Sequence, residues 1–170
     1  NSDGYDDVII GAWRADPEGK SDAGASYVVF GKASGFSADL DLSSLNGSNG
    51  YRLDGVDADD ISGYSVSNAG DVNGDGFDDI IIGAYGADLD GKSAAGESYV
   101  VFGKVSGFSS SLDLSSLNGS NGFRLDGVDQ YDNSSTSVSS AGDVNGDGYD
   151  DVIIGAMYAG PDGKSNGGES

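Results

Sequence analysis

The chain alternates short apolar runs with stretches rich in Gly, Asn, Asp and Ser. The apolar runs favour Val, Ile, Tyr and Phe, which are typical of β-strands, and no segment keeps the 3.6-residue hydrophobic period of a helix. Four such runs follow one another in the middle of the chain, over residues 65–71, 79–84, 98–103 and 122–127. The pattern therefore predicts an all-β protein built from short strands.

The same pattern indicates where each strand lies within a sheet. Residues 80–82 and 99–102 are continuously apolar, which predicts burial on both faces. Residues 123–126 alternate apolar and polar side chains, as an outer strand does. Four antiparallel strands with two-sided middle strands suit a blade of a β-propeller, because neighbouring blades cover both faces. A β-sandwich is the alternative.

The chain is also internally repeated. The segment that begins at Asp3 recurs at Asp75 and Asp147, a period of 72 residues, and residues 3–74 match the next 72 at 54 positions. The 170 residues therefore hold two units and about a third of another. We expect a β-propeller segment of about two and a quarter four-stranded antiparallel blades, with nine strands. Its predicted parts are a partial blade with strands 2 to 4 (1–61), a complete blade (62–133) and a partial blade with strands 1 and 2 (134–170).

Composition and charge exclude several classes of function. The chain carries 29 acidic and 8 basic residues, a formal net charge of −21, which argues against nucleic-acid binding. It has no Cys and no His, so disulfides, thiolate metal sites, ordinary zinc sites and Ser-His-Asp catalysis are excluded. No apolar stretch approaches the roughly 18 residues of a membrane span, so we expect no membrane insertion.

The turn between the first and second strands of the unit carries the candidate chemistry. Residues 71–79 have the form D-x-N-x-D-G-x-x-D, and residues 143–151 repeat it. Oxygen-bearing side chains at alternate positions can point into one concavity, and the seventh residue can offer its carbonyl. Hard oxygen ligands without nitrogen or sulfur favour Ca²⁺. The predicted calcium ligands in these loops, and in a first copy without its leading Asp, are Asp71, Asn73, Asp75, Phe77, Asp79, Asp143, Asn145, Asp147, Tyr149, Asp151, Asn1, Asp3, Tyr5 and Asp7.

Two other interpretations of these loops are a simple hairpin turn and an EF-hand. Asp, Asn and Gly favour turns, but turn chemistry alone does not require acids at positions one, five and nine together. An EF-hand needs a bidentate Glu at position twelve followed by a helix. Position twelve is Ile82 or Ile154, inside an apolar run. A calcium-clamped β-hairpin is therefore the prediction, with the simple turn as its alternative.

Residues 86–93 match the pattern G-x-x-x-x-G-K-S of a phosphate-binding loop. The equivalent of Gly86 is Arg14 in the first copy and Tyr158 in the third, and Asp88 would repel phosphate. We therefore interpret the segment as a surface loop. The calcium-loop acids recur from copy to copy, as a structural requirement does, whereas an active site is normally unique, so we expect no enzyme in this chain.

Residues 71–84 and 143–156, in a unit of blade length, resemble FG-GAP repeats of the integrin α-subunit β-propeller type. The copies are most similar to those of large, repetitive bacterial surface or secreted proteins. The resemblance implies a seven-bladed propeller with calcium loops and a role in adhesion or ligand binding at the cell surface. The chain departs from the family where Ser62-Gly63 and Ser134-Ser135 replace Phe-Gly, and where three residues replace the Pro of Gly-Ala-Pro: Trp13, Tyr85 and Met157.

These observations predict a calcium-binding β-propeller module of an extracellular or cell-surface protein, with a structural or adhesive role. An accessory binding domain attached to an enzyme or a glycan-binding protein is one alternative, and a self-assembling propeller fragment is another. The expected partners are further repeats of the same array, other copies of the chain, or a cell-surface protein or glycan. We expect Trp13, Arg14 and Tyr85 to pack locally rather than to contact such a partner.

Overall fold

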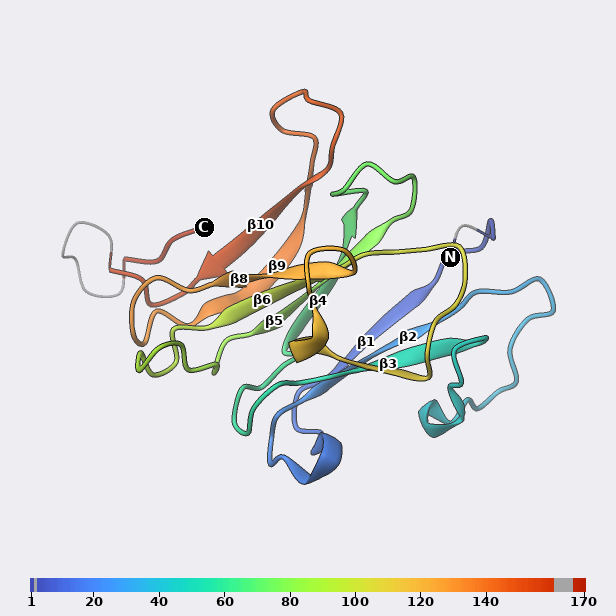
Figure 1. The fold of residues 1–170 in the computed structure, drawn as a ribbon, viewed down its shortest axis with the longest axis horizontal. Coiled ribbons are helices and arrows are strands. Elements are labelled where there is room, and N and C mark those ends of the chain that lie inside the picture. The colour runs from blue at the N-terminus through green and yellow to red at the C-terminus, as the bar shows by residue number, and fades with distance from the viewer. Residues whose placement is uncertain (2, 161–166) are drawn as a thin grey trace.

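The computed structural model describes residues 1, 3–160 and 167–170, which form three β-sheets (Figure 1). These residues contain no α-helix, only three short 3₁₀ turns (Pro17–Gly19, Leu42–Ser44 and Leu114–Ser116). The strands are β1 (Val8–Ala12), β2 (Ala25–Val29), β3 (Gly50–Asp54), β4 (Ser65–Gly70), β5 (Asp79–Ala84), β6 (Glu97–Val101), β7 (Ser111–Asp113), β8 (Gly122–Asp126), β9 (Ser134–Gly142) and β10 (Asp151–Ala156).

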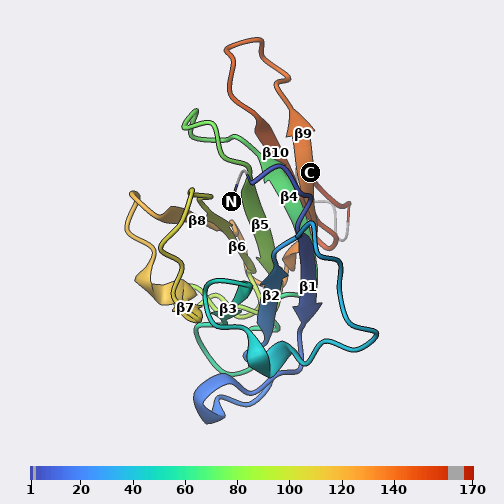
Figure 2. The ribbon, with the colours of Figure 1, turned by 90° about the vertical axis from the view of Figure 1, so that its right-hand side faces the viewer.

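The three sheets follow the repeat. The first has the order β1-β2-β3-β7, the second β4-β5-β6-β8, and the third pairs β9 with β10. All pairs of neighbouring strands are antiparallel except β3 and β7. In Figure 2 the strands run roughly from top to bottom of the picture, with β1 and β2 (blue) low in the view and β9 and β10 (orange and red) high in it. The all-β fold with four-stranded sheets confirms the predicted fold class, whereas the boundaries after residues 61 and 133 stay a prediction.

Strand β7 corrects the predicted number of nine strands. It lies in the segment 102–121 that joins β6 to β8, but it pairs in parallel with β3 of the preceding sheet, Leu112 opposite Leu53. Local pattern did not predict it, because three residues that alternate polar and apolar do not distinguish a strand from a loop. The partner that makes it a strand belongs to another repeat.

Two hydrophobic clusters hold the second sheet between its neighbours. On one face, Ile82 and Tyr99 pack with side chains of β2 and β3 in a cluster that includes Leu53. On the other face, Ile81 and Val100 pack with side chains of β9 and β10. All five residues of β6 are buried. Burial on both faces of β5 and β6 confirms the prediction from their continuous apolar runs.

Adjacent sheets also meet through their backbones. The Ser62 N–H, just before β4, donates a hydrogen bond to the Ala23 carbonyl oxygen, just before β2 of the first sheet, at 3.0 Å. A Cβ at Gly83 would lie 2.3 Å from the Ser135 carbonyl oxygen of the next unit, and a Cβ at Gly11 would lie 2.0 Å from that of Gly63. The Gly of the first two Ile-Gly-Ala segments is therefore required by the close approach of the following unit, which the sequence alone did not indicate.

Candidate calcium loops

The loops 71–78 and 143–150 connect β4 to β5 and β9 to β10, and they project from the same end of their sheets (Figure 1). The first copy of the sequence lies immediately before β1. In each case the ninth residue of the motif begins or precedes a strand. The predicted ligands are thereby held between two paired strands or beside one.

In the loop 71–79, side-chain carboxylate and amide oxygens accept hydrogen bonds from the backbone N–H groups of the turn. Asp71 accepts hydrogen bonds from the N–H groups of Gly74, Asp75 and Gly76, at 2.8–3.0 Å. Asn73 Oδ1 accepts from the Asp75 N–H, at 2.8 Å. Gly74 and Gly76 have φ of +75° and +87°, which favours Gly at these two positions. The D-x-N-x-D-G spacing therefore stabilises the turn itself, whether or not the loop binds a ligand.

The third copy repeats this arrangement. Asp143 accepts from the N–H groups of Gly146, Asp147 and Gly148, at 2.7–3.1 Å. The hydrogen bond from Gly148, with those from its neighbours, lowers the pKa of the Asp143 carboxyl. Two further motif side chains accept backbone N–H groups in the same way as their counterparts, namely Asn145 from Asp147 and Asp147 from Tyr149. Both complete copies therefore share one local conformation.

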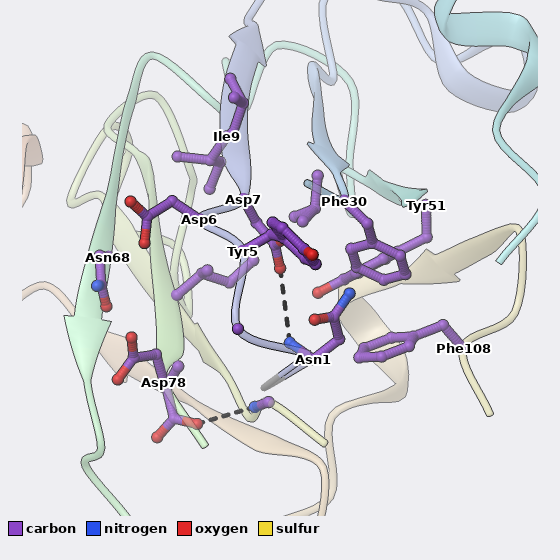
Figure 3. Close-up of a pocket in the computed structure, with 16 residues that line it drawn as sticks. Asn1, Tyr5, Asp6, Asp7, Ile9, Phe30, Tyr51, Asn68, Asp78 and Phe108 are labelled. Carbon is purple, nitrogen blue, oxygen red and sulfur yellow. Dashed lines mark hydrogen bonds and ion pairs between the residues drawn. The ribbon is translucent and has the colours of Figure 1, made fainter. Parts of the chain in front are cut away.

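The first copy keeps the alternate-residue pattern. The Asn1 side chain accepts from the Asp3 N–H, and Asp3 accepts from the Tyr5 N–H, at 3.1 and 3.0 Å. Asp7 accepts from the Gly31 N–H at 2.8 Å and lies 3.5 Å from the Asn1 amino group. Figure 3 shows Asn1, Tyr5 and Asp7 at the edge of a cavity of about 530 Å³, with Asp78, the last residue of the loop before β5, across from them.

Asp79, the ninth residue of the motif, is buried at the end of the second loop. Asp79 has no exposed surface, and its two carboxylate oxygens accept from the N–H groups of Gly103 (2.8 Å) and Val72 (3.0 Å). Burial raises the pKa of this carboxyl to about 6, against those hydrogen bonds, and the nearby Asp75 and Asp71 raise it further. A nearby positive charge would favour the ionised form of Asp79. Sequence reasoning missed Gly103, whose N–H comes from the segment after β6.

The donor set of these loops fits a hard cation. It consists of carboxylate, side-chain amide and backbone carbonyl oxygens, which are the ligands that Ca²⁺ prefers. The carboxylates are turned towards backbone N–H groups, and among the described residues no three acidic side chains converge closely enough to form a metal-binding group. The loops therefore offer suitable donors, and gathering them around an ion would require the side chains to turn.

The acid beside the ninth position has a separate role. Asp150 Oδ2 accepts a hydrogen bond from the Asp71 N–H, at 2.9 Å, and so connects the third copy to the start of the second loop. A Cβ at Gly70 would lie 2.2 Å from the same oxygen. Asp79 of the second copy is thus buried beside its own loop, whereas Asp150 of the third copy caps the loop of the preceding unit. Only the spatial neighbour reveals this second role.

Residues 86–93 form a tight β-connection, with mutual backbone hydrogen bonds between Leu89 and Lys92. The Lys92 ammonium donates to the Val128 carbonyl oxygen, and no helix follows the loop. The structure therefore agrees with a surface loop rather than a phosphate-binding loop.

The aromatic residues predicted to pack locally do so. The Arg14 guanidinium lies 4.3 Å from the centroid of the Trp13 ring, and Tyr64 packs edge-on between Trp13 and Tyr85 at centroid distances of 6.2 and 4.6 Å.

Comparison with known proteins identifies the repeat. The FG-GAP repeat family matches residues 62–101 and 135–170. Bovine phosphatidylinositol-glycan-specific phospholipase D is 31% identical over 168 residues, which cover 98% of this chain and 18% of that protein. Integrin alpha pat-2 of Caenorhabditis elegans is 41% identical over 105 residues, or 58% of this chain and 8% of that protein. Human integrin alpha-IIb is 32% identical over 114 residues, or 67% and 10%.

The chain thus spans less than a fifth of the length of these relatives. The comparisons and the sheets define the class of protein: the chain is a segment of a β-propeller, and its units are FG-GAP repeats, as in integrin α chains. None of the helices among the described residues is long and apolar enough to cross a membrane.

Proposed function

We propose that this chain is a calcium-binding β-propeller module of an extracellular or cell-surface protein, with a structural or adhesive role. Three copies of one acidic loop, which share the same pattern of side-chain to backbone hydrogen bonds, support the proposal. The single strongest observation is Asp79, a fully buried carboxyl whose pKa is raised by burial and by the negative Asp75 and Asp71. A bound cation would offset the repulsion between these charges.

Ca²⁺ would be held by the side chains at positions one, three, five and nine and by the carbonyl of position seven. In the second loop these residues are Asp71, Asn73, Asp75, Asp79 and Phe77. Bound Ca²⁺ would supply the positive charge that offsets the repulsion between the loop carboxylates. Because the unfolded chain does not present this donor set, binding would stabilise the folded hairpins and couple their stability to the external Ca²⁺ concentration.

Thermal unfolding in millimolar Ca²⁺, in Mg²⁺ and in a chelator, at matched ionic strength, tests the proposal. Matching matters because any salt screens a net charge of −21. We expect the unfolding temperature to rise specifically with Ca²⁺. A concentration of 100 times the Kd would contribute about 3 kcal/mol for each site.

Asp75→Asn and Asp147→Asn are the variants that accompany this measurement. Each removes one charge from a loop but keeps an oxygen that can accept the backbone N–H. Asp39→Asn is the matched control, because Asp39 is exposed and lies outside the loops. The loop variants should reduce the Ca²⁺-dependent shift, whereas the control should not. Equal unfolding temperatures in Ca²⁺, Mg²⁺ and chelator would contradict the proposal and leave the simple-turn interpretation.

A second candidate function is an accessory module attached to an enzyme. The observation that favours it is the 98% coverage of this chain by a protein named as a phospholipase D, of which it spans only 18%. In that case the module would present a surface to a cell-surface protein or glycan. Binding of the chain to immobilised cell-surface glycans in Ca²⁺, compared with chelator, would separate this candidate from a purely structural role.

A further inference from the structure

Two hydrogen bonds join Asp150 of the third copy to Asp71 of the second. The Asp150 carboxylate accepts from the Asp71 N–H at 2.9 Å, and the Asp150 N–H donates to the Asp71 carbonyl oxygen at 3.1 Å. One residue therefore holds both backbone polar groups of Asp71. Asp71 is the first predicted ligand of residues 71–79, called the second loop below, and residues 143–151 are called the third loop.

A further contact joins the same two loops. A Cβ at Gly74 would lie 2.3 Å from Cε1 and 2.9 Å from Cδ1 of Tyr149, so the Tyr149 ring lies against the Gly74 backbone. Gly74 has a φ of +75°, and its N–H donates to the Asp71 side chain at 2.8 Å. Tyr149 and Asp150 therefore contact both the first residue of the second loop and its turn.

The residues that make these contacts belong to the candidate calcium site of the third loop. The carbonyl of Tyr149 and the carboxylate of Asp151 are predicted ligands, and Asp150 lies between them. Successive side chains point to opposite sides where a chain enters a strand. Accordingly, Asp151 accepts the Val144 N–H of its own loop at 2.9 Å, whereas Asp150 reaches the neighbouring loop. An ion that fixes residues 149 and 151 must therefore also fix Asp150.

The exposure of the loops gives this connection an energetic consequence. Residues 143–149 are all exposed, and exposed loops that are held by local hydrogen bonds open at a low free-energy cost. A ligand that orders one such loop lowers the ordering cost of a second loop in contact with it. The contacts from Tyr149 and Asp150 supply that route between the third loop and the second.

We propose that the second and third loops bind Ca²⁺ with positive cooperativity, and that Asp150, assisted by Tyr149, is the positioning residue that couples them. A third loop that holds Ca²⁺ would keep Asp150 on the Asp71 backbone and the Tyr149 ring on Gly74, so that the second loop is already ordered. This inference deepens the proposed calcium-binding function and rests on it. By thermodynamic reciprocity, occupation of the second loop raises the affinity of the third by the same factor.

Charge repulsion between two bound ions acts in the opposite direction. Two divalent cations in neighbouring loops would lower each other's affinity, and salt would weaken that effect, since the Debye length is about 8 Å at 0.15 M ionic strength. Hydrogen bonds and ring contacts are not screened in this way. Positive cooperativity at this ionic strength is therefore the result expected from the contacts, and negative cooperativity the result expected from charge alone.

An NMR titration of the 170-residue protein with Ca²⁺ at fixed ionic strength follows each loop separately. The Gly76 amide reports the second loop and the Gly148 amide the third, since each donates to the first ligand of its loop. Asp147→Asn weakens the third loop, and we expect it to raise the Ca²⁺ midpoint of Gly76 by at least about fivefold. Asp75→Asn should raise the midpoint of Gly148 by the same factor, provided that the mutated loop stays empty, which its own glycine amide shows.

Variants of Asp150 test whether this residue carries the coupling. In Asp150→Ala, a further Asp147→Asn substitution should no longer shift the Gly76 midpoint, and this double-mutant comparison cancels the direct effect of the lost Asp147 charge. Asp150→Asn keeps an oxygen that can accept the Asp71 N–H and should retain most of the coupling. Asp78→Ala is the matched control, because Asp78 has the same motif position in the second loop but lines the cavity beside the first copy. It should leave the coupling unchanged.

The outcomes separate this inference from the calcium proposal. Binding at both loops with a Gly76 midpoint that Asp147→Asn leaves unchanged or lowers would overturn the inference alone. Coupling that persists in Asp150→Ala would overturn the role assigned to Asp150. If neither glycine amide responds to Ca²⁺ while protected amides in β5 and β6 show a folded protein, the calcium proposal fails, and this inference fails with it.

Discussion

At the scale of single residues, close packing between repeats decides which glycines are required. A Cβ at Gly83 would meet the Ser135 carbonyl oxygen at 2.3 Å, a distance that real side chains do not adopt. A Cβ at the equivalent Gly155 would meet its nearest neighbour, the Ser137 Cβ, at 3.7 Å, which is ordinary contact. The same motif position therefore carries different constraints in two copies.

Gly83→Ala should consequently destabilise the protein by about 1–3 kcal/mol, the usual cost of overpacking, or more if the seam between sheets opens. Gly155→Ala should change stability little or raise it slightly, since Ala lowers the entropy of the unfolded chain. Urea denaturation of both variants measures the difference. Equal effects at the two positions would show that the close approach at Gly83 does not hold in solution.

Asp60 makes the free energy of unfolding depend on pH. Its side chain is buried, and its carboxylate accepts the Asp57 N–H at 2.9 Å. Burial raises the pKa of the carboxyl to about 6, and the negative Glu97 raises it further. Between the unfolded value of 3.8 and about 6, the folded state binds the proton more tightly. The contribution of Asp60 to stability is therefore most favourable below pH 4 and falls as the pH rises through 6.

Asp60→Asn keeps an oxygen acceptor for the Asp57 N–H and removes the buried charge. We expect it to raise stability at pH 7 by about 1–2 kcal/mol and to flatten the decline between pH 4 and 7. Urea denaturation across this range at fixed Ca²⁺ measures both effects. Asp132→Asn, at the equivalent but less buried position, is the control. A variant profile parallel to that of the unmodified protein would assign the pH dependence to other groups.

At the scale of elements, the segment 102–121 shows that a strand can depend on its partner. Phe108→Ala removes the ring that stacks on Tyr51 and meets Phe30. We expect it to cost about 2–3 kcal/mol and to speed hydrogen exchange in β7. Phe36→Ala changes the same residue type in a nearly identical but exposed segment and should be close to neutral. If both substitutions cost the same, local packing of the segment rather than docking stabilises it.

The loops between the first two strands of each unit are also coupled across sheets. Asp150 accepts the N–H of Asp71, so the third unit caps the second candidate calcium loop. Asp150→Ala should lower the Ca²⁺-dependent shift of the second loop although Asp150 is not a predicted ligand. A loop-specific probe, such as the exchange rate of the Gly74 and Gly76 amides, follows this effect. Unchanged exchange of these amides in the variant would show that the cap is dispensable.

At the scale of the whole molecule, the sheets differ in how fully they are covered. The second sheet lies between two hydrophobic clusters, and β5 and β6 are almost entirely buried. Strand β10 has no fully buried residue. We therefore expect native-state hydrogen exchange to be slowest in β5 and β6 and fastest in β10. Equal protection in the three sheets would mean that the chain unfolds as one cooperative unit.

The sequence by itself determined the strands of each unit other than β7, the repeat and the composition of the acidic loops. These features are local: the two-sided burial of β5 and β6 follows from continuous apolar runs, and the turn at 71–79 from Asp, Asn and Gly at fixed spacing. With the exception of those made by the ninth-position acid, the hydrogen bonds within each loop join residues at most five positions apart in the sequence. Their pattern is therefore already present in the motif.

Only the tertiary structure decided which residues serve contacts between units. The strand character of 111–113, the cap from Asp150 to Asp71 and the hydrogen bond from Gly103 to Asp79 each join residues 24 or more positions apart. Residues 40–41 and 112–113 are identical, yet only 112–113 lie in a strand. The physical reason is that a β-strand is completed by its hydrogen-bonding partner, and that partner lies in a different repeat.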